Sequence, residues 1–306
     1  MRFINPKTDF AFKKIFGSSE SKDILISFLN ALIYDGEPTI EDLEILDPYL
    51  SPQFQGLKDT YLDVKAKLNN GTIVIIEMQV LNVESFEKRI LYNAAKAYSL
   101  QLTKGRNYRN LQSVIALTIT DFVLFADLSK IISHFVFKER ETHLEYIENG
   151  IELIFVELPK FLKQLEELEN LTDQWLYFMK SAGILDSIPD SMGQIPEIRR
   201  AFTIANQANL NEKELEELEK QEIWIQDRQG ELDWVMNEGR AQGRADGRAQ
   251  GRAEGRAQGR AEGRAEGEKE KAIAIARQLL GRLDPEAIAQ TTGLSLEDIQ
   301  ALEQND

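Results

Sequence analysis

The stretch from Tyr61 to Val80 constrains the fold of this chain more than any other part of the sequence. It reads YLDVKAKLNNGTIVIIEMQV, with two runs of alternating residues on either side of Asn69-Asn70-Gly71. Alternation around a short segment that contains glycine predicts a β-hairpin. Because one face of the alternation is apolar, that face is expected to pack on a hydrophobic core.

The length of the loop decides which residues face each other across the hairpin. A three-residue loop with Gly71 in the left-handed conformation pairs Leu68 with Thr72, and it therefore places Asp63 opposite Glu77. A two-residue loop would shift the register by one position and turn the two carboxylates to opposite sides. The residue pattern favours the three-residue loop, because the apolar residues at even-numbered positions of both strands then form one face. These residues are Leu62, Val64, Ala66, Leu68, Val74, Ile76, Met78 and Val80.

Asp63 and Glu77 would then be cross-strand neighbours with Cβ atoms roughly 5 Å apart. Like charges at that separation destabilise a hairpin unless they share a proton or a cation. A hard divalent cation such as Mg²⁺ prefers carboxylate oxygens, so the pair is a candidate metal site. The alternative is an exposed face on which Lys65 and Lys67 neutralise the two acids.

Cysteine is absent from the 306 residues, and His134 and His143 are the only histidines. Disulfides, zinc–thiolate sites and cysteine nucleophiles are therefore excluded, and histidine-based hydrolysis is disfavoured. Carboxylates remain as the main catalytic resource. No apolar run reaches the roughly 18 residues of a membrane helix, and the first ten residues lack the apolar core of a signal peptide. We therefore expect a cytoplasmic protein without a membrane partner.

The residues around the hairpin predict a mixed α/β core. Thr8 is a candidate N-cap and Gly17 a candidate end for the first helix. Residues 113–120 are almost all apolar and rich in β-branched side chains, which is typical of a buried central strand. Helices are expected at 9–16, 21–33 and 83–103, a strand or helical turn at 40–46, and further strands at 133–137, 144–147 and 152–158.

From Phe161 onward the pattern becomes helical and strongly acidic. Residues 111–238 hold 11 basic and 25 acidic side chains, which accounts for most of the net charge of −15. An acidic surface repels phosphate, so a DNA contact is expected on residues 1–110 or on the arginines near the C-terminus. Helices are expected at 162–169, 173–182, 195–207 and 212–229.

Residues 239–267 form a tetrad repeat, seven copies of Gly-Arg-Ala-(Gln/Asp/Glu) closed by Gly267. Each of its eight glycines costs a helix roughly 1 kcal/mol relative to alanine. We therefore expect a flexible linker or a marginal helix that a partner chain orders. If the repeat is helical, its period of four exceeds 3.6 residues and favours a right-handed coil. A basic stripe that binds nucleic acid is the alternative.

The C-terminus has the spacing of a helix-turn-helix, with Asp284-Pro285 starting one helix and Ser295 the next. However, residues 284–306 contain six acids and no lysine or arginine, which does not suit a DNA-reading helix. We expect instead a dimerisation or protein-contact element and a homo-oligomer formed through this region. The predicted organisation is a core at 1–160, a helical extension at 161–238, the repeat at 239–267 and a small helical element at 268–306.

Several segments together resemble the recombination-promoting nuclease family, which is transposase-related and belongs to the PD-(D/E)XK nuclease superfamily. They are TDFAFKKIFG (8–17), YLDVKAKLNNGTIVIIEMQ (61–79), RILYNAAKAYSLQL (89–102), IELIFVELPKF (151–161), DQWLYFMK (173–180) and EAIAQTTGLSLEDIQAL (286–302). The resemblance implies a restriction-endonuclease-like fold, in which a mixed central sheet is flanked by helices and followed by an α-helical C-terminal region. It also implies a bacterial-type DNA endonuclease that acts in DNA recombination and depends on Mg²⁺ or another divalent cation.

The resemblance assigns roles to individual residues. Asp63 and Glu77 would hold the metal ion. Asp9 would lie near the metal, and Arg89 and Tyr92 would flank the site.

Two positions depart from the superfamily pattern. Leu62 stands in place of the proline, and Gln79 stands in place of the lysine that would orient the attacking water. Gln79 would take over that catalytic role, and Lys65 is a candidate substitute for the missing charge. Because the lysine is missing, the alternative function is a weak or inactive nuclease fold that binds DNA or protein and oligomerises. Strand transfer is disfavoured, because no third carboxylate is well placed.

Overall fold

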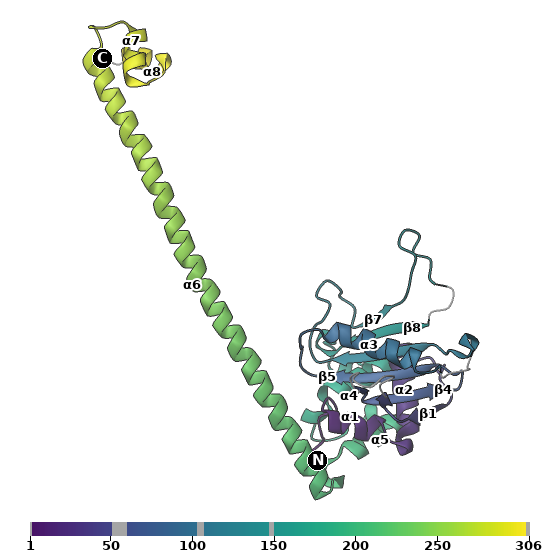
Figure 1. Ribbon diagram of the computed structural model, residues 1–306. Coiled ribbons are helices and arrows are strands. Elements are labelled where there is room, and N and C mark those ends of the chain that lie inside the picture. Colours follow the sequence, from purple (N-terminus) through teal and green to yellow (C-terminus); the bar gives the residue numbers. More distant parts are fainter. Residues whose placement is uncertain (1, 51–59, 103–106, 147–149, 304–306) are drawn as a thin grey trace. The chain divides into compact units, whose positions relative to one another are not determined.

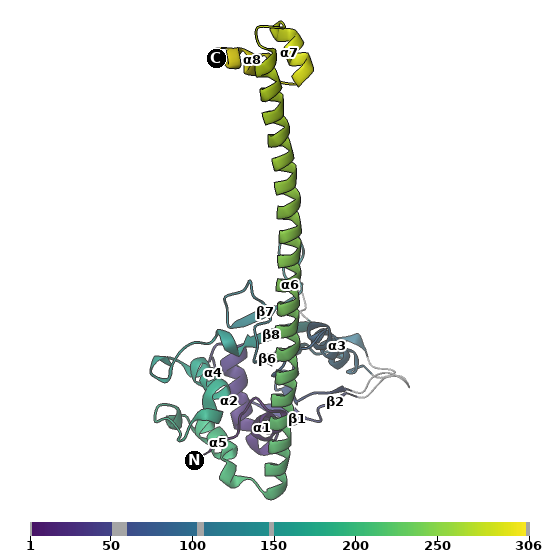
Figure 2. The same cartoon turned by 90° about the vertical axis from the view of Figure 1, so that its left-hand side faces the viewer.

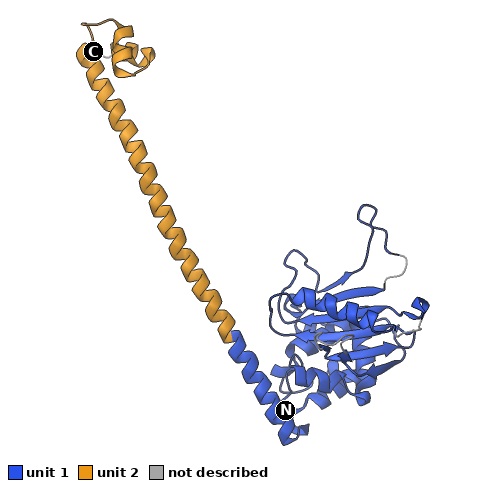
Figure 3. Cartoon of the chain, in the orientation of Figure 1, with its two compact units in different colours: residues 1–229 blue, residues 230–306 orange. Residues whose placement is uncertain are grey.

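The computed structural model shown in Figure 1 describes residues 2–50, 60–102, 107–146 and 150–303. The chain forms two compact units, residues 1–229 and residues 230–306, which Figure 3 shows in different colours. The division at 160, 238 and 267 that the sequence suggests stays a prediction.

The first unit contains a six-stranded sheet, a small two-stranded sheet and surrounding helices. In spatial order the large sheet is β1 (Leu43–Leu46), β4 (Val64–Leu68), β5 (Ile73–Gln79), β6 (Val114–Thr120), β8 (Ile151–Glu157) and β7 (Ile132–Phe135). The small sheet pairs β2 (Tyr49–Leu50) with β3 (Thr60–Tyr61). The helices are α1 (Asp9–Phe16), α2 (Lys22–Ile33), α3 (Phe86–Ser99), α4 (Leu171–Ser181), α5 (Pro196–Ala205) and the first turns of α6 (Glu212–Leu279). Short 3₁₀ helices lie at Ser19–Ser21, Tyr108–Asn110, Leu158–Lys160, Leu165–Glu167, Ala182–Ile184, Met192–Gln194 and Gln207–Asn209.

The large sheet is mixed. Strands β1, β4 and β5 pair antiparallel, β5, β6 and β8 pair parallel, and β7 is antiparallel to β8. Helix α3 makes the crossover between the parallel strands β5 and β6. In Figure 2, α3 lies on one side of the sheet, and α1, α2, α4 and α5 lie on the other. This mixed sheet flanked by helices confirms the predicted fold class.

The hairpin has the predicted three-residue loop. Val64 pairs with Ile76 and Lys67 with Ile73, and the Leu68 N–H donates to the Thr72 carbonyl at 2.9 Å. Gly71 has a φ of 93°, the left-handed conformation that this loop requires. The register argument is therefore confirmed over β4 and β5.

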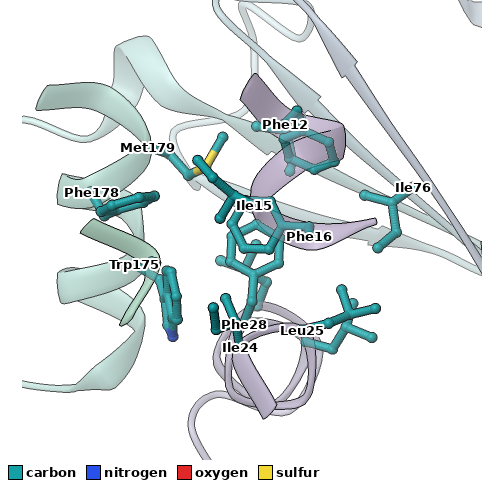
Figure 4. Packing of buried hydrophobic residues seen from close by; sticks show 14 of the residues in the cluster. Phe12, Ile15, Phe16, Ile24, Leu25, Phe28, Ile76, Trp175, Phe178 and Met179 are labelled. Atoms are coloured by element: carbon teal, nitrogen blue, oxygen red, sulfur yellow. The ribbon is translucent and has the colours of Figure 1, made fainter. Parts of the chain in front are cut away.

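Both faces of β5 are buried, which explains why its sequence is apolar on odd as well as even positions. Ile76 packs into the larger core beneath α1, α2 and α4, where aromatic side chains such as Phe16 and Trp175 gather (Figure 4). On the other face, Ile73 and Ile75 pack against α3. Strand β6 is buried along its whole length, as a central strand is expected to be.

Local signals at the ends of helices also behave as predicted. The Thr8 hydroxyl accepts a hydrogen bond from the Ala11 N–H at the start of α1, and the Gly17 N–H donates to the Lys13 carbonyl at its end. Helix α1 is thereby fixed at both ends, with Asp9 in its first turn.

Two predicted elements are wrong. Described residues 144–146 form only an isolated bridge between Lys138 and Glu145, and no strand. The helix expected at 162–169 shrinks to the 3₁₀ turn Leu165–Glu167. There the Glu169 N–H, which a helix over 162–169 would bond to the Leu165 carbonyl, donates instead to the Asp173 carboxylate at 3.0 Å.

The second unit begins at residue 230, within α6. The repeat at residues 239–267 is part of this helix, and all residues from 230 to 266 are exposed. Helices α7 (Pro285–Thr292) and α8 (Leu296–Glu303) follow, with Asp284 capping α7 and Gly293 at its end. Both pack on the last turns of α6 through a small apolar cluster: Ala276, Ile288, Leu294 and Ile299. Across the described ranges, no helix combines the length and apolar character needed to cross a membrane.

Candidate active site

A pocket of about 720 Å³ opens beside the C-terminal end of β5 and the first turns of α3. Every site residue suggested by the sequence except Lys65 lines this one pocket. The residues brought together are Asp9, Asp63, Glu77, Gln79, Arg89 and Tyr92. Lys65 instead sits on β4 between Leu46 and Ile75, where burial lowers its pKa.

The local fold explains how distant residues meet in the pocket. Asp63 directly precedes β4, and Glu77 lies near the end of β5, so the register of the hairpin brings them to one end of the sheet. On α3, Arg89, Tyr92 and Asn93 are three and four positions apart and therefore share a helix face. That face lines the pocket.

The Asp63 carboxylate is held in a largely buried position, with 17% of its side chain exposed. Its Oδ2 accepts a hydrogen bond from the Met78 N–H at 2.7 Å, and its Oδ1 lies 3.7 Å from the Lys13 Nζ. Burial raises the pKa of Asp63 from its ordinary value of 3.8 to about 7, and the neighbouring Asp9 adds to this rise. The folded protein therefore disfavours the ionised form of Asp63.

Glu77 is similarly buried, with 13% of its side chain exposed. Its Oε1 accepts from the Asn93 Nδ2 at 2.5 Å, and its Oε2 lies 3.9 Å from the Arg89 Nη2. Burial raises the pKa of Glu77, and the hydrogen bond from Asn93 and the nearby positive charge of Arg89 oppose the rise.

These two carboxylates fit a hard divalent cation. Each is buried at a cost that a bound cation would offset, and each offers oxygen ligands of the kind that Mg²⁺ prefers. Asp9 is paired with Lys13 at 2.7 Å. Within the described ranges, no group of three or more His, Cys, Asp or Glu side chains is gathered tightly enough to hold a metal. Mg²⁺ is commonly bound by one or two carboxylates, with water and phosphate oxygens completing its shell.

Gln79 has partners at both ends of its amide. Its Oε1 accepts from the Arg89 Nη2 at 2.5 Å, and its Nε2 donates to the Leu81 carbonyl at 2.8 Å. Gln79 therefore connects the Arg89 guanidinium to the backbone of Leu81.

The rim of the pocket contains residues that sequence reasoning did not identify. Asn93 comes from α3, the exposed Tyr61 comes from β3, and Trp224 and Arg228 come from α6. The first turns of α6 reach this position because Gln221 accepts a hydrogen bond from the Phe10 N–H at 2.9 Å. Spacing could have identified Asn93, four residues after Arg89, but no local pattern links α6 to the hairpin.

The pocket lies within a part of the chain that matches a known protein family. A family model described as "PD-(D/E)XK nuclease family transposase" matches residues 6–234, which include every residue of the pocket. Searches of curated proteins and of solved structures found no match.

Proposed function

Because the chain belongs to the PD-(D/E)XK nuclease family transposases, we propose that it is a metal-dependent DNA endonuclease that hydrolyses phosphodiester bonds. The observation that carries this proposal is the pair of buried carboxylates, Asp63 and Glu77, on the wall of one pocket. Burial raises the pKa of both carboxyl groups, and a bound cation would offset the cost of ionising them.

In this proposal Asp63 and Glu77 hold Mg²⁺ or another divalent cation. When bound, such a cation lowers the pKa of a water molecule and stabilises charge on phosphate oxygens. The protein's own part is to orient the two ligands: the Met78 N–H fixes the Asp63 carboxylate, and the Asn93 amide fixes that of Glu77. Hydrogen bonds of this kind keep ligands in place and raise affinity.

The substrate would lie across the open side of the pocket. Arg89 and Arg228 line it and supply positive charge for backbone phosphates. The exposed rings of Tyr61, Tyr92 and Trp224 offer flat apolar surfaces beside them. Arg89, Tyr61 and Tyr92 belong to the first part of the chain, where a DNA contact was expected, whereas Arg228 and Trp224 come from the acidic middle.

The test is a plasmid-nicking assay on the full chain with Mg²⁺ and with EDTA. Asp63→Ala and Glu77→Gln are expected to lower the rate by at least about a hundredfold, since each removes a metal ligand. Glu44→Gln is the matched control, because Glu44 is an exposed carboxylate on β1 outside the pocket. An Asp63→Ala protein that cuts as fast as the parent would refute the proposal.

A second function is supported by the C-terminal region, which we propose as a self-association element. Residues 239–267 are helical and exposed throughout 239–266, yet they contain eight glycines that together cost roughly 8 kcal/mol relative to alanine. A helix of this composition gains stability from packing against another helix. Sedimentation of the full chain and of a chain ending at residue 238 tests this: loss of a dimer or larger oligomer on truncation is expected, and identical monomers would exclude it.

A further inference from the structure

The amide of Gln79 is held in one orientation by two partners of opposite kind. The Leu81 carbonyl can only accept a hydrogen bond, and the Arg89 guanidinium can only donate one. The amide therefore has to present Nε2 to Leu81 and Oε1 to Arg89, as it does at 2.8 Å and 2.5 Å. Because Gln79 is the last residue of β5 and Leu81 lies two residues beyond it, the guanidinium is anchored to the end of the sheet through Gln79.

Arg89 is held close to Glu77 but not in contact with it. Its Nη2 lies 3.9 Å from the Glu77 Oε2, whereas paired guanidinium and carboxylate groups approach to about 2.8 Å. The guanidinium also lies over the Phe86 ring, 5.2 Å from the centroid, and 44% of the side chain is exposed. One of its five N–H donors is used by Gln79, and Arg89 is among the residues that line the pocket.

Such an arrangement keeps two groups available at once. A free arginine next to a buried carboxylate would close into a bidentate pair, which would occupy the Glu77 oxygen and neutralise the guanidinium. Holding the guanidinium back leaves Glu77 for a cation and Arg89 for a phosphate. Gln79 carries no charge, so it exerts this effect only through the side chain it holds.

We propose that Gln79, which stands where the superfamily pattern has lysine, is a positioning residue that acts through Arg89, and that Arg89 supplies a phosphate-binding cation in the pocket. This inference rests on the proposed function for its biological meaning, but the contacts that carry it are independent of cleavage.

If Gln79 positions Arg89, replacing the neutral Gln79 should change the salt dependence of DNA binding. Each phosphate contact made by a cation adds roughly 1 to the slope of log affinity against log salt concentration. Arg89→Ala should therefore reduce that slope by about 1. Gln79→Ala removes no charge, and it should nevertheless reduce the slope by a similar amount, because the guanidinium turns away from phosphate toward Glu77.

The experiment measures binding of the full chain to a labelled duplex oligonucleotide in Ca²⁺ across a salt series, for the parent, Gln79→Ala, Arg89→Ala and the double variant. The two single variants should lose affinity by similar factors, and the double variant should lose no more than Arg89→Ala alone. Gln101→Ala is the control, because Gln101 bonds to the Gln112 backbone outside the pocket; it should leave the slope unchanged.

Two outcomes would overturn the inference. An unchanged salt slope in Gln79→Ala would mean that Gln79 does not place the guanidinium. A double variant whose loss equals the product of the two single losses would mean that Gln79 acts on its own, for instance on the attacking water.

The same variants in the nicking assay separate this inference from the proposed function. A parent that binds DNA with the expected slopes but never cuts would refute the nuclease and leave the positioning role standing. A parent that cuts normally, together with an unchanged salt slope in Gln79→Ala, would support the nuclease and refute the positioning role of Gln79.

Discussion

Replacing Asp63 by asparagine should make the metal-free protein more stable at pH 8, although it removes a proposed metal ligand. The folded state raises the pKa of Asp63 from 3.8 to about 7, so at pH 8 folding forces an ionised carboxylate into a place that disfavours it. A rise of about three pKa units corresponds to about 4 kcal/mol, the upper limit of the gain. Asparagine loses the attraction of Lys13 at 3.7 Å but can still accept from the Met78 N–H. We therefore expect a gain of about 2 kcal/mol or more.

The pH dependence of the gain follows from the direction of the pKa rise. Between pH 3.8 and about 7 the folded state binds more protons at Asp63 than the unfolded state does, so stability falls as the pH rises through this window. Below the window Asp63 is protonated in both states and costs nothing. The gain from Asp63→Asn should therefore shrink by more than half between pH 8 and pH 5.

The assay is urea unfolding in EDTA, followed by tryptophan fluorescence, in which Trp175 goes from fully buried to exposed whereas Trp224 and Trp234 are already exposed in the folded protein. Glu44→Gln provides the same chemical change at an exposed strand position and should shift the midpoint little. Adding Mg²⁺ should stabilise the parent and not Asp63→Asn, since only the parent keeps both ligands. A lower midpoint for Asp63→Asn at pH 8 in EDTA, or a gain that does not vary with pH, would refute the reasoning.

Three further substitutions test the fold and its C-terminal helix. Gly71→Ala should lower the free energy of unfolding by about 1–2 kcal/mol in urea, because φ is 93° at this position and the new Cβ would lie 2.5 Å from the Gln112 side chain. Gly251→Ala should raise helicity measured by circular dichroism, with about 1 kcal/mol of local stabilisation, since nothing lies within 4 Å of its added Cβ; lower helicity would contradict this. Thr8→Ala should cost about 1 kcal/mol through loss of the α1 cap. Thr8→Ser keeps the hydroxyl, and an equal loss in both variants would show that the cap does not matter.

The central hairpin was predictable because its information is local. Alternation in β4 and β5 defines the buried face, and a glycine in the loop sets the register, so the residues opposite each other follow by counting. The same reasoning identified the caps of α1, where Thr8 and Gly17 lie next to the residues they serve.

The contacts around the pocket were only partly predictable. Arg89 and Tyr92 were noted from their spacing on a helix, but nothing in the sequence says that Gln79 bonds to Arg89 rather than to water. That contact depends on the crossing of α3 over β5, which is a property of tertiary packing. Trp224 was missed for the same reason, because it lies 147 positions after Glu77 in a different helix.

The helix expected at 162–169 failed because charged side chains compete with the backbone. Asp173 accepts a hydrogen bond from the Glu169 N–H, and Glu167 caps the start of the short 3₁₀ turn by accepting from the Gln164 N–H, so apolar spacing alone was a misleading guide. The tetrad repeat shows the converse, since residues with low helix propensity lie within the continuous helix α6.

The proposed function depends most on Asp63 and Glu77 holding a divalent cation. Anomalous diffraction from crystals of the full chain grown with Mn²⁺, a stand-in for Mg²⁺, locates the ion directly. We predict a peak bonded to carboxylate oxygens of both residues, at roughly 2.0–2.2 Å, with water completing the shell. A map with no peak at these two carboxylates, or with the ion bound at other residues, would contradict the account.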